Sequence, residues 1–307
     1  MRRATDHLHA AWRTPREDLH EDSQPVYRKA FDFVQSLAAE LTKGHVDLPA
    51  YPEVAMRVRE VLADEDVTNE RIARVIVSDA GLAARMLALA NSAALARGGK
   101  PLTDLKLAIT RVGQENVRSA ALAYALAQLR AAESLSHIRQ DLAQLWQKST
   151  MVAAVARVLA QRTRAAGPDE ALLAGLLHNV GCVYILARSD EHCEFLRNAA
   201  ARDAVMRDWH AHIGKAIAQN WGLPEHVTEA IGDQDTADRF EATRRDLVDV
   251  LFVAVRAADY HARPELLELS IGGMPAFQRL ALDGPALRTV MLESAEEIAG
   301  LRSALGD

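Results

Sequence analysis

The stretch SDAGLAARMLALANSAALARGGKPLTDLKLAITRVGQENVRSAALA, residues 78–123, decides the fold class. Its apolar residues recur every three or four positions, which places them on one face of a helix. The first stripe consists of Leu82, Met86, Leu89 and Ala93. Asp79 is suited to cap this helix at its start, and the glycine pair at 98–99 marks a loop after it. This stretch therefore predicts helices rather than strands.

The same pattern continues on both sides of this stretch. Upstream, a helical face is formed by Val54, Val58, Val61 and Leu62. Thr68 or Asn69 can cap a short helix after it. Downstream, Thr103 or Asp104 starts a helix that Gly113 ends, because glycine is favoured just after a helix terminus. The first half of the chain is thus predicted to be a series of short helices.

The second half is also predicted to be helical, and the whole chain to be all-α. Its expected helices are 138–164, 171–187, 190–202, 209–221, 224–232, 243–260 and 284–304. Gly167 and Pro168 break the first of these from the second, since proline is favoured at a helix start. Aromatic residues make up only 5% of the chain, and alternating strand patterns are not evident.

We divide the chain into three parts. Residues 1–24 mix both charges without an apolar stripe and are expected to form a mobile arm. Residues 25–130, which begin with a helix over 25–43, are expected to form an N-terminal helical bundle. Residues 131–307 are expected to form a second, C-terminal bundle. A length of 307 residues suits either one large domain or two small ones.

Composition narrows the classes of function. The formal net charge of −6 gives no overall attraction to nucleic acid or an anionic membrane, so neither partner is expected. The two cysteines, Cys182 and Cys193, exclude a disulfide scaffold and are interpreted as packing residues in a reducing cytoplasm. The uncharged run 171–187 contains a histidine and an asparagine and is predicted to be a buried helix rather than a membrane span.

One acidic residue stands out from its surroundings. The segment LVDVLFVAVRAADYH, residues 247–261, is apolar on nearly all sides, and Asp259 lies near its C-terminal end. The helix dipole disfavours a carboxylate there, so a buried Asp259 needs a cation, a metal ion or several hydrogen-bond donors.

Several stretches together resemble the HDOD domain, a bacterial helical module related to HD-type phosphohydrolases. They are LPAYPEVAMRVREVL (48–62), residues 78–123, LWQKSTMVAAVARVLA (145–160), EALLAGLLHNVG (170–181) and HIGKAIAQNWGLPEHVTEAI (212–231). The resemblance begins near residue 48 and ends near residue 243. It implies two packed helical bundles, of which the second resembles the core of an HD phosphohydrolase. It also implies a role in signalling through protein interaction.

The resemblance also assigns positions to the metal site of HD enzymes, which is formed by a histidine, a His-Asp pair and a distant aspartate. The matching residues are Lys148, His178, Asn179 and Asp259. Asn179 offers a neutral oxygen where an anion is needed, and the Lys148 ammonium repels a divalent cation. We therefore expect a vestigial site without metal or cofactor. Lys148 and Asp259 are predicted to form a buried ion pair, or to lie within one water molecule of doing so.

Other side chains have less specific interpretations. His210 matches a position from which it can contribute to the wall of the former active-site pocket, although a lone histidine is more often a core residue. Arg157, Arg162 and Arg164 are interpreted as a solvated helix face, with contact to an acidic partner or a cyclic dinucleotide as the alternative. Trp146 and the other tryptophans in apolar helical patterns are predicted to be core or groove-lining residues.

Three functions remain open. The first is a cytoplasmic regulatory module without enzymatic activity, which binds a signalling protein in trans through a concave surface between the bundles. The second is a residual metal-dependent phosphohydrolase or phosphodiesterase that uses His178, Asp259 and His210. The third is a nucleotide sensor in which His178, Asn179 and Lys148 contact the ligand without hydrolysing it.

Overall fold

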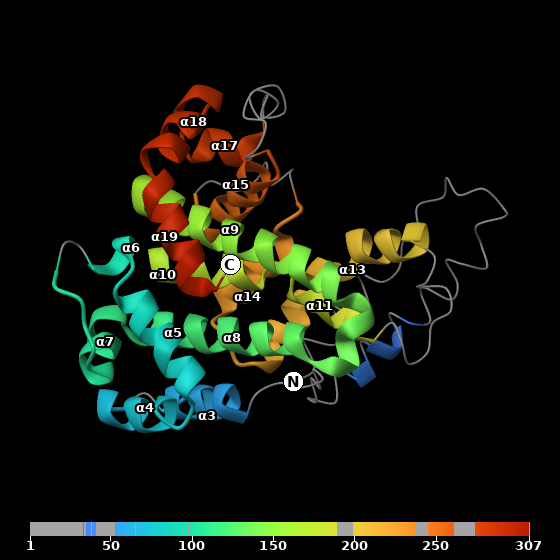
Figure 1. Cartoon of the computed structure of the whole chain (residues 1–307). Helices are drawn as coiled ribbons and strands as arrows, with labels where there is room; N and C mark the ends of the chain where they lie inside the picture. The colour runs from blue at the N-terminus through green and yellow to red at the C-terminus, as the bar shows by residue number, and fades with distance from the viewer. Residues whose placement is uncertain are drawn as a thin grey trace, which may run out of the picture.

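The computed structural model describes residues 33, 35–37, 39–40, 53–64, 66–96, 99–188, 199–236, 245–260 and 274–306. All regular structure within these ranges is helical, which confirms the all-α prediction (Figure 1). The arm predicted at 1–24 lies outside the described residues.

The upstream bundle contains short helices packed on one long helix. It consists of α3 (Glu53–Leu62), α4 (Asn69–Ile76), α5 (Ala80–Ala90), α6 (Ala93–Ala96), α7 (Leu105–Val112) and α8 (Gln114–Ala131). The long helix α8 contacts α3, α5 and α7. Three of the four residues of the first predicted stripe, Leu82, Met86 and Leu89, are fully buried. The fourth, Ala93, is exposed at the start of α6.

The caps settle the alternatives that the sequence left open. Thr68 rather than Asn69 caps α4, since its hydroxyl accepts from the backbone N–H of Arg71 at 3.3 Å. Asp104 rather than Thr103 caps α7, and its carboxylate accepts from Leu107 N at 2.8 Å. Asp79 caps α5 as predicted. Each cap satisfies one backbone donor that the first helical turn leaves unpaired.

The downstream bundle is arranged around α9. After the 3₁₀ helix η2 (Glu133–Ile138), its helices are α9 (Arg139–Thr163), α10 (Pro168–Leu177), α11 (Val180–Ala187), α13 (Ala199–Asn220), α14 (Glu225–Asp233), α15 (Leu247–Asp259), α17 (Pro275–Arg279), α18 (Gly284–Glu293) and α19 (Ala295–Leu305). Helices α8, α10, α15 and α19 all contact α9. Figure 1 shows the two bundles as successive layers, with α8 and α9 where they meet.

Several predicted helix boundaries were wrong. The expected helix 171–187 is divided at His178 and Asn179 into α10 and α11, and the expected helix 284–304 is divided at Ser294. Conversely, residues 199–220 form one helix instead of two, because Val205 is buried and continues the apolar face across the predicted gap. Residues 190–198 lie outside the described ranges.

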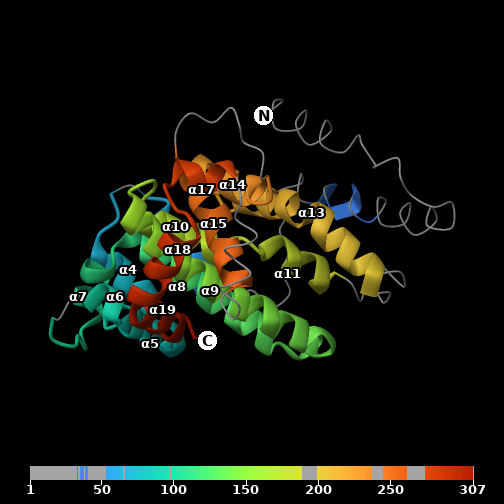
Figure 2. The ribbon, with the colours of Figure 1, turned by 90° about the horizontal axis from the view of Figure 1, so that it is seen from above.

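Contacts link the parts of the chain on either side of residue 130. Glu40, which is helical like the described residues 35–37 and 39, accepts a hydrogen bond from Tyr184 of α11 at 3.0 Å. Figure 1 shows this blue ribbon on the α11 side of the molecule, away from α3, and Figure 2 shows it beside α13. At the other end, α19 contacts α5 and α6 of the upstream bundle as well as α9.

Burial corrects one interpretation and supports another. Arg157 is only 3% exposed and pairs with Asp169, so it does not belong to a solvated face. Arg162 does lie at the surface, where it pairs with Glu293 at 3.0 Å. The stretch Pro168–Ala187, which contains α10 and α11, is long and apolar enough to cross a membrane, but most of it is buried inside the structure, which is typical of core helices.

Candidate functional site

The site is built around the junction of α10 and α11, where His178 ends the first helix and Asn179 precedes the second. Two glycines hold this junction against its neighbours. A Cβ at Gly175 would lie 2.5 Å from Ala153 Cα, and a Cβ at Gly181 would lie 2.0 Å from the carbonyl oxygen of His210. Only glycine allows these backbones to approach so closely. The junction is therefore held between α9 and α13.

His178 is a buried, neutral imidazole. The side chain is 1% exposed, and its Nδ1 lies 2.7 Å from the carbonyl oxygen of Gly175. Since a carbonyl only accepts, Nδ1 carries the proton and donates. Burial lowers the pKa of His178 to about 3, and the charges of Lys148 and His210 add to this effect. At neutral pH Nε2 therefore presents a lone pair, and it has no hydrogen-bond partner in the described structure.

Asn179 contributes a second buried polar atom without a partner. The residue is 6% exposed, and its Nδ2 makes no hydrogen bond within the described part of the chain. Its side chain does not cap α11. The junction thus presents one acceptor, His178 Nε2, and one donor, Asn179 Nδ2.

Lys148 of α9 and Asp259 of α15 form an ion pair, with Nζ 2.7 Å from Oδ1. Arg256 lies on the other side of the carboxylate, 4.0 Å from Oδ2. The predicted proximity of Lys148 and Asp259 is therefore found. The prediction that the pair is buried was wrong, because the two side chains are 39% and 37% exposed. Asp259 is the last residue of α15, where the helix reaches the surface.

His210 belongs to α13, and its side chain faces Asp235, which follows α14. Its Nδ1 is 2.7 Å from the carbonyl oxygen of Met206, and its Nε2 is 3.3 Å from Asp235 Oδ2. Both ring nitrogens thus face acceptors, and the charged imidazolium can donate to both. His210 is near enough to His178 to contribute to the lowered pKa of His178.

The sequence analysis missed the residues that follow α14. Gln234 is 1% exposed, and its Nε2 donates to the carbonyl oxygens of His178 at 2.8 Å and Ile231 at 2.9 Å. Together with Asp235 it ties the end of α14 to the junction. The only sequence signal is the polar run GDQD directly after an apolar helix, and that pattern is common at ordinary helix ends.

The predicted packing residues behave as expected where the structure describes them. Cys182 is 7% exposed, and burial raises the pKa of its thiol to about 12, so the reactive thiolate is suppressed. Cys193 lies outside the described residues. Trp146 and Trp221 are buried, and Trp209 is partly buried against the core.

The donor set does not fit the metal of HD enzymes. An ammonium group, Lys148 Nζ, stands at one ligand position and already contacts the carboxylate at another. A charged lysine has no lone pair for a cation. Among the residues that the structure describes, no group of three histidine, cysteine, aspartate or glutamate side chains is arranged to hold a metal ion.

These features define the HD-like class of protein. They are a helical bundle, a histidine with a polar neighbour at a helix junction, and an aspartate that comes from a later helix. The HDOD domain family model matches residues 48–237. The chain belongs to the HDOD domain family.

A relative in Treponema pallidum (strain Nichols), an uncharacterized protein, is 31% identical over 209 residues. The match covers 64% of this chain and spans only 39% of the relative.

Three solved structures share the fold. A Shewanella amazonensis SB2B protein, named as a proposed metal-dependent phosphohydrolase, has a TM-score of 0.73 at 24% identity and covers 90% of this chain and 99% of its own. An HDOD domain protein of unknown function from Geobacter sulfurreducens has a TM-score of 0.57 at 23% identity, and the match covers 90% of this chain and 98% of that protein. A Marinobacter aquaeolei VT8 protein, named as a proposed signal transduction protein, has a TM-score of 0.56 at 19% identity, and the match covers 99% of this chain and 66% of that protein. At these identities the likeness concerns the fold alone.

The family match ends before α15, so Asp259 lies downstream of it. The Lys148–Asp259 pair therefore connects a helix inside the matched segment to one outside it. The structural likeness to the Shewanella amazonensis protein extends over most of this chain, which indicates that the downstream helices belong to the shared fold.

Proposed function

We propose that this protein is a cytoplasmic regulatory module without enzymatic activity, which acts by binding a signalling protein in trans. The observation that carries the proposal is the Lys148–Asp259 ion pair at 2.7 Å. It supplies from within the chain the positive charge that a metal ion supplies in HD enzymes. Lys148 then takes the electrostatic place of the cation beside Asp259.

The chemistry of the junction supports this proposal over hydrolysis. Metal-assisted hydrolysis needs a cation that lowers the pKa of a bound water molecule or polarises a phosphate oxygen. At Asn179 a neutral amide stands where the enzymes have a carboxylate, which removes negative charge from the ligand set. At Lys148 an ammonium group stands in place of a histidine and repels a cation. His178 alone, neutral and buried, does not compensate for this loss.

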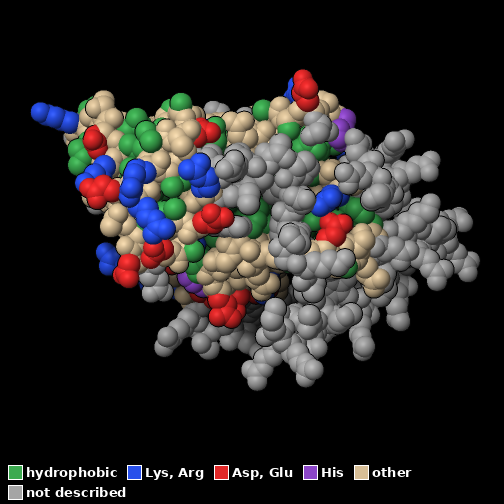
Figure 3. Space-filling view, turned by 90° about the horizontal axis from the view of Figure 1, so that it is seen from below, with side chains coloured by type: hydrophobic (Ala, Val, Ile, Leu, Met, Phe, Trp, Pro, Cys, Tyr) green, Lys and Arg blue, Asp and Glu red, His purple; other side chains and the backbone are tan. Residues whose placement is uncertain are grey.

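The surface supports a protein partner more than a nucleic acid. On the described part of the face shown in Figure 3, lysine and arginine side chains alternate with aspartate and glutamate. The ion pairs Arg71–Asp64 and Lys106–Glu70 are examples of such exposed pairing. Nucleic-acid binding favours a continuous basic patch, whereas mixed charge suits a polar protein interface. The HDOD family and the fold shared with a proposed signal transduction protein fit a regulatory role.

The test restores the metal ligands that the site lacks. The native protein and the Lys148→His, Asn179→Asp double variant are purified from medium supplied with Mn²⁺, Fe²⁺, Mg²⁺ and Zn²⁺, and their metal content is measured. We expect the native protein to be empty and the double variant to hold about one ion per chain. Lys106→His, which places a histidine on the exposed face of α7, controls for adventitious binding by any added imidazole.

Two results would contradict the proposal. One is a near-stoichiometric metal ion in the native protein. The other is hydrolysis of a phosphodiester or nucleotide by the native protein that Asp259→Ala abolishes. Either would favour the residual phosphohydrolase.

A second candidate function is the binding of a nucleotide without hydrolysis. It is favoured by the exposure of Lys148, 39%, beside the unpartnered Nε2 of His178 and Nδ2 of Asn179. A phosphate group could replace Asp259 as the acceptor for Lys148. Calorimetry against mononucleotides and cyclic dinucleotides tests this function. Binding should be lost in Lys148→Ala and kept in Lys106→Ala, and the absence of binding heat for every nucleotide would count against it.

A further inference from the structure

Helix α19 lies across both bundles. It contacts α5 and α6 of the upstream bundle and α9 of the downstream bundle, and Figure 1 shows this red helix between α9 and α6. Its buried residues recur every three or four positions and are Ile298, Leu301, Ala304 and Leu305. One apolar face of α19 is therefore shared between helices from the two halves of the fold.

The end of α19 is fastened by one polar side chain from each bundle. The last turn of a helix leaves carbonyl oxygens without partners inside the helix. Gly306, with a φ of 88°, ends α19 in the left-handed region and bonds its own N–H back to the last turn. From the upstream bundle, Arg85 of α5 donates to the carbonyl oxygen of Leu305. From the downstream bundle, Nε1 of Trp146 in α9 donates to the carbonyl oxygen of Gly306 at 3.2 Å.

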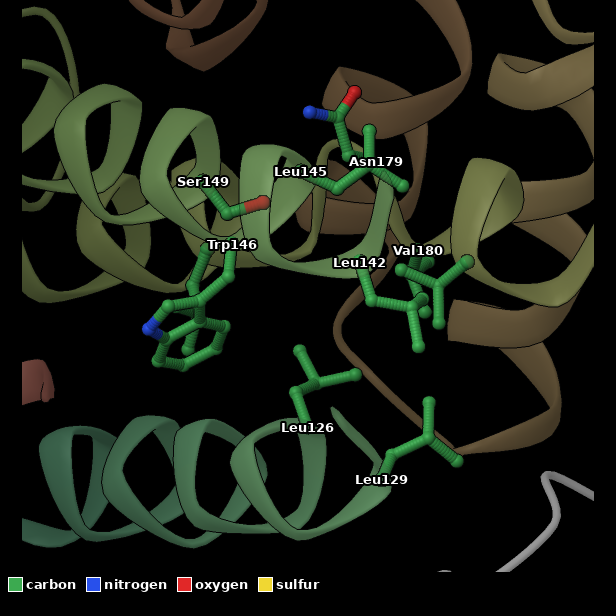
Figure 4. Close-up of a pocket in the computed structure, with 10 residues that line it drawn as sticks. Leu126, Leu129, Leu142, Leu145, Trp146, Ser149, Asn179 and Val180 are labelled. Carbon is green, nitrogen blue, oxygen red and sulfur yellow. The ribbon is translucent and has the colours of Figure 1, made fainter. Parts of the chain in front are cut away.

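The two donors suit this position for different reasons. Arg85 brings a positive charge to the negative end of the α19 dipole. Trp146 is buried, and it lines one small pocket with Leu126 and Leu129 of α8. Its ring nitrogen points away from these two leucines in Figure 4. A buried indole N–H needs an acceptor, and α19 supplies one.

The attachment of α19 decides whether it stays in place. The helix has 11 residues, and a helix of that length is marginal in water unless it is packed against other elements. Local opening of one such element costs less free energy than global unfolding. The hydrogen bonds from Arg85 and Trp146 are the polar contacts that this opening has to break at the end of the helix.

We propose that α19 is a releasable strap, which holds the upstream bundle on α9 through Arg85 and Trp146. Detachment of its end breaks one hydrogen bond to each bundle and uncovers the faces of α5 and α6 on which α19 packs. Helix α9 also carries Lys148, so the strap acts on a helix that forms the candidate site. This inference goes beyond the proposed function, because it requires neither a partner nor a vestigial metal site.

Hydrogen exchange of the full chain, resolved by helix, tests the strap. Arg85→Met removes the charged donor and keeps an unbranched side chain. The end of α19 should then open more often, so exchange of its amides should become about tenfold faster. Exchange in α5 and α6 should become about threefold faster, because they lose their cover, whereas α14 should keep its native rate. Arg85→Lys keeps a charged donor and should give an intermediate rate in α19.

The control for the loss of an arginine is Arg71→Met. Arg71 belongs to α4 and pairs with Asp64 at the surface, where both side chains are exposed. We expect this variant to leave the exchange rates of α5, α6 and α19 at their native values, since a surface ion pair contributes little to stability.

A pair of glycine variants tests the same fastening without deleting a side chain. Gly306 and Gly222 both have a positive φ, 88° and 66°, so alanine is strained at either position. A Cβ at Gly306 would also collide with the guanidinium of Arg85, whereas nothing lies within 4 Å of one at Gly222. We expect faster exchange throughout α19 in Gly306→Ala and native exchange of α19 in Gly222→Ala. If circular dichroism shows that Arg85→Met does not fold, Gly306→Ala takes its place.

Three results would overturn the proposal. The first is native exchange of α19 in both Arg85→Met and Gly306→Ala. The second is faster exchange confined to the last turn of α19, which would mean fraying without any effect on the bundles. The third is an equal increase in α14, which would mean a general loss of stability. None of them bears on the metal content of the protein, so failure of this proposal is distinguishable from failure of the proposed function.

Discussion

Asp249 of α15 and Arg279 of α17 form a two-point ion pair, with Arg279 Nε 2.8 Å from Oδ2 and Nη2 2.6 Å from Oδ1 of Asp249. The Asp249 side chain is 1% exposed and that of Arg279 is 13% exposed. This is a parallel arrangement of two charge-assisted hydrogen bonds in a buried setting. It fixes α17, a helix of five residues, on α15, the helix that delivers Asp259.

Removal of one partner of this pair should be strongly destabilising. We expect Asp249→Ala to lower the free energy of unfolding by about 3–5 kcal/mol, since it removes the buried carboxylate that accepts two charge-assisted hydrogen bonds from Arg279. Urea denaturation followed by circular dichroism measures the change. Asp64→Ala, which breaks the exposed pair with Arg71, is the matched control and should cost less than about 1 kcal/mol. Similar losses in the two variants would show that the Asp249 pair contributes no more than a surface pair.

The Lys148–Asp259 pair should contribute little to stability despite its short distance. Both side chains are more than a third exposed, so solvent screens the attraction and the coupling should be below about 1 kcal/mol. A double-mutant cycle with Lys148→Ala and Asp259→Ala, measured by urea denaturation, gives this coupling. A coupling above about 2 kcal/mol would mean that the pair is shielded from water and that its main role is in folding.

Local signals in the sequence were sufficient for the fold. Asp79 was identified as a cap because a carboxylate at that position can accept from the next turn, and Leu82 and Met86 because a buried helix face repeats every three or four residues. The junction at His178 was not predicted, because the run 171–187 is uncharged and apolar on both sides of His178 and Asn179, and no glycine or proline stands at the break itself. The break is fixed by close backbone contacts at Gly175 and Gly181, which only the folded structure shows.

For the site, too, the sequence predicted some residues and missed others. The family resemblance selected Lys148, His178, Asn179 and Asp259, and the structure brings Lys148 and Asp259 into contact. Gln234 and Asp235 were missed because their role depends on how α14 ends beside α10 and α13. The exposure of the Lys148–Asp259 pair was misjudged for a similar reason: sequence places Asp259 at the end of an apolar helix but cannot say that this end reaches the surface.

Glycine at position 181 should be required for the junction. Gly181→Ala places a Cβ 2.0 Å from the carbonyl oxygen of His210, a backbone atom that cannot move without displacing α13. We expect a loss of about 1–3 kcal/mol or more in the free energy of unfolding. Gly300→Ala is the matched control inside α19, where the nearest atoms to the added Cβ are 3.6 Å away. That change should stabilise the protein by about 0.5–1 kcal/mol, because alanine is the better helix former. Thermal unfolding distinguishes the two, and equal effects of the same sign would refute the close approach.

The buried imidazole of His178 should make stability depend on pH in the acidic range. Its pKa is about 3 in the folded protein and 6.5 in its ordinary state, so between these values the unfolded chain binds a proton that the folded protein does not. Unfolding is then favoured as pH falls through this window, and the contribution of His178 is fully present only above pH 6.5. The expected slope approaches about 1.4 kcal/mol per pH unit.

His178→Gln removes this titration, so its unfolding free energy should fall less steeply with pH between 6.5 and about 4 than that of the native protein. The absolute stability of the variant is secondary, because it is the slope that reports the proton. His226→Gln is the control: His226 lies at the surface, paired with Glu170 at 2.9 Å, and its removal should leave most of the slope in place. If His178→Gln keeps the native slope, or if the His178 ring protons titrate in NMR near pH 6.5, the imidazole is accessible to water and its Nε2 is not a buried acceptor.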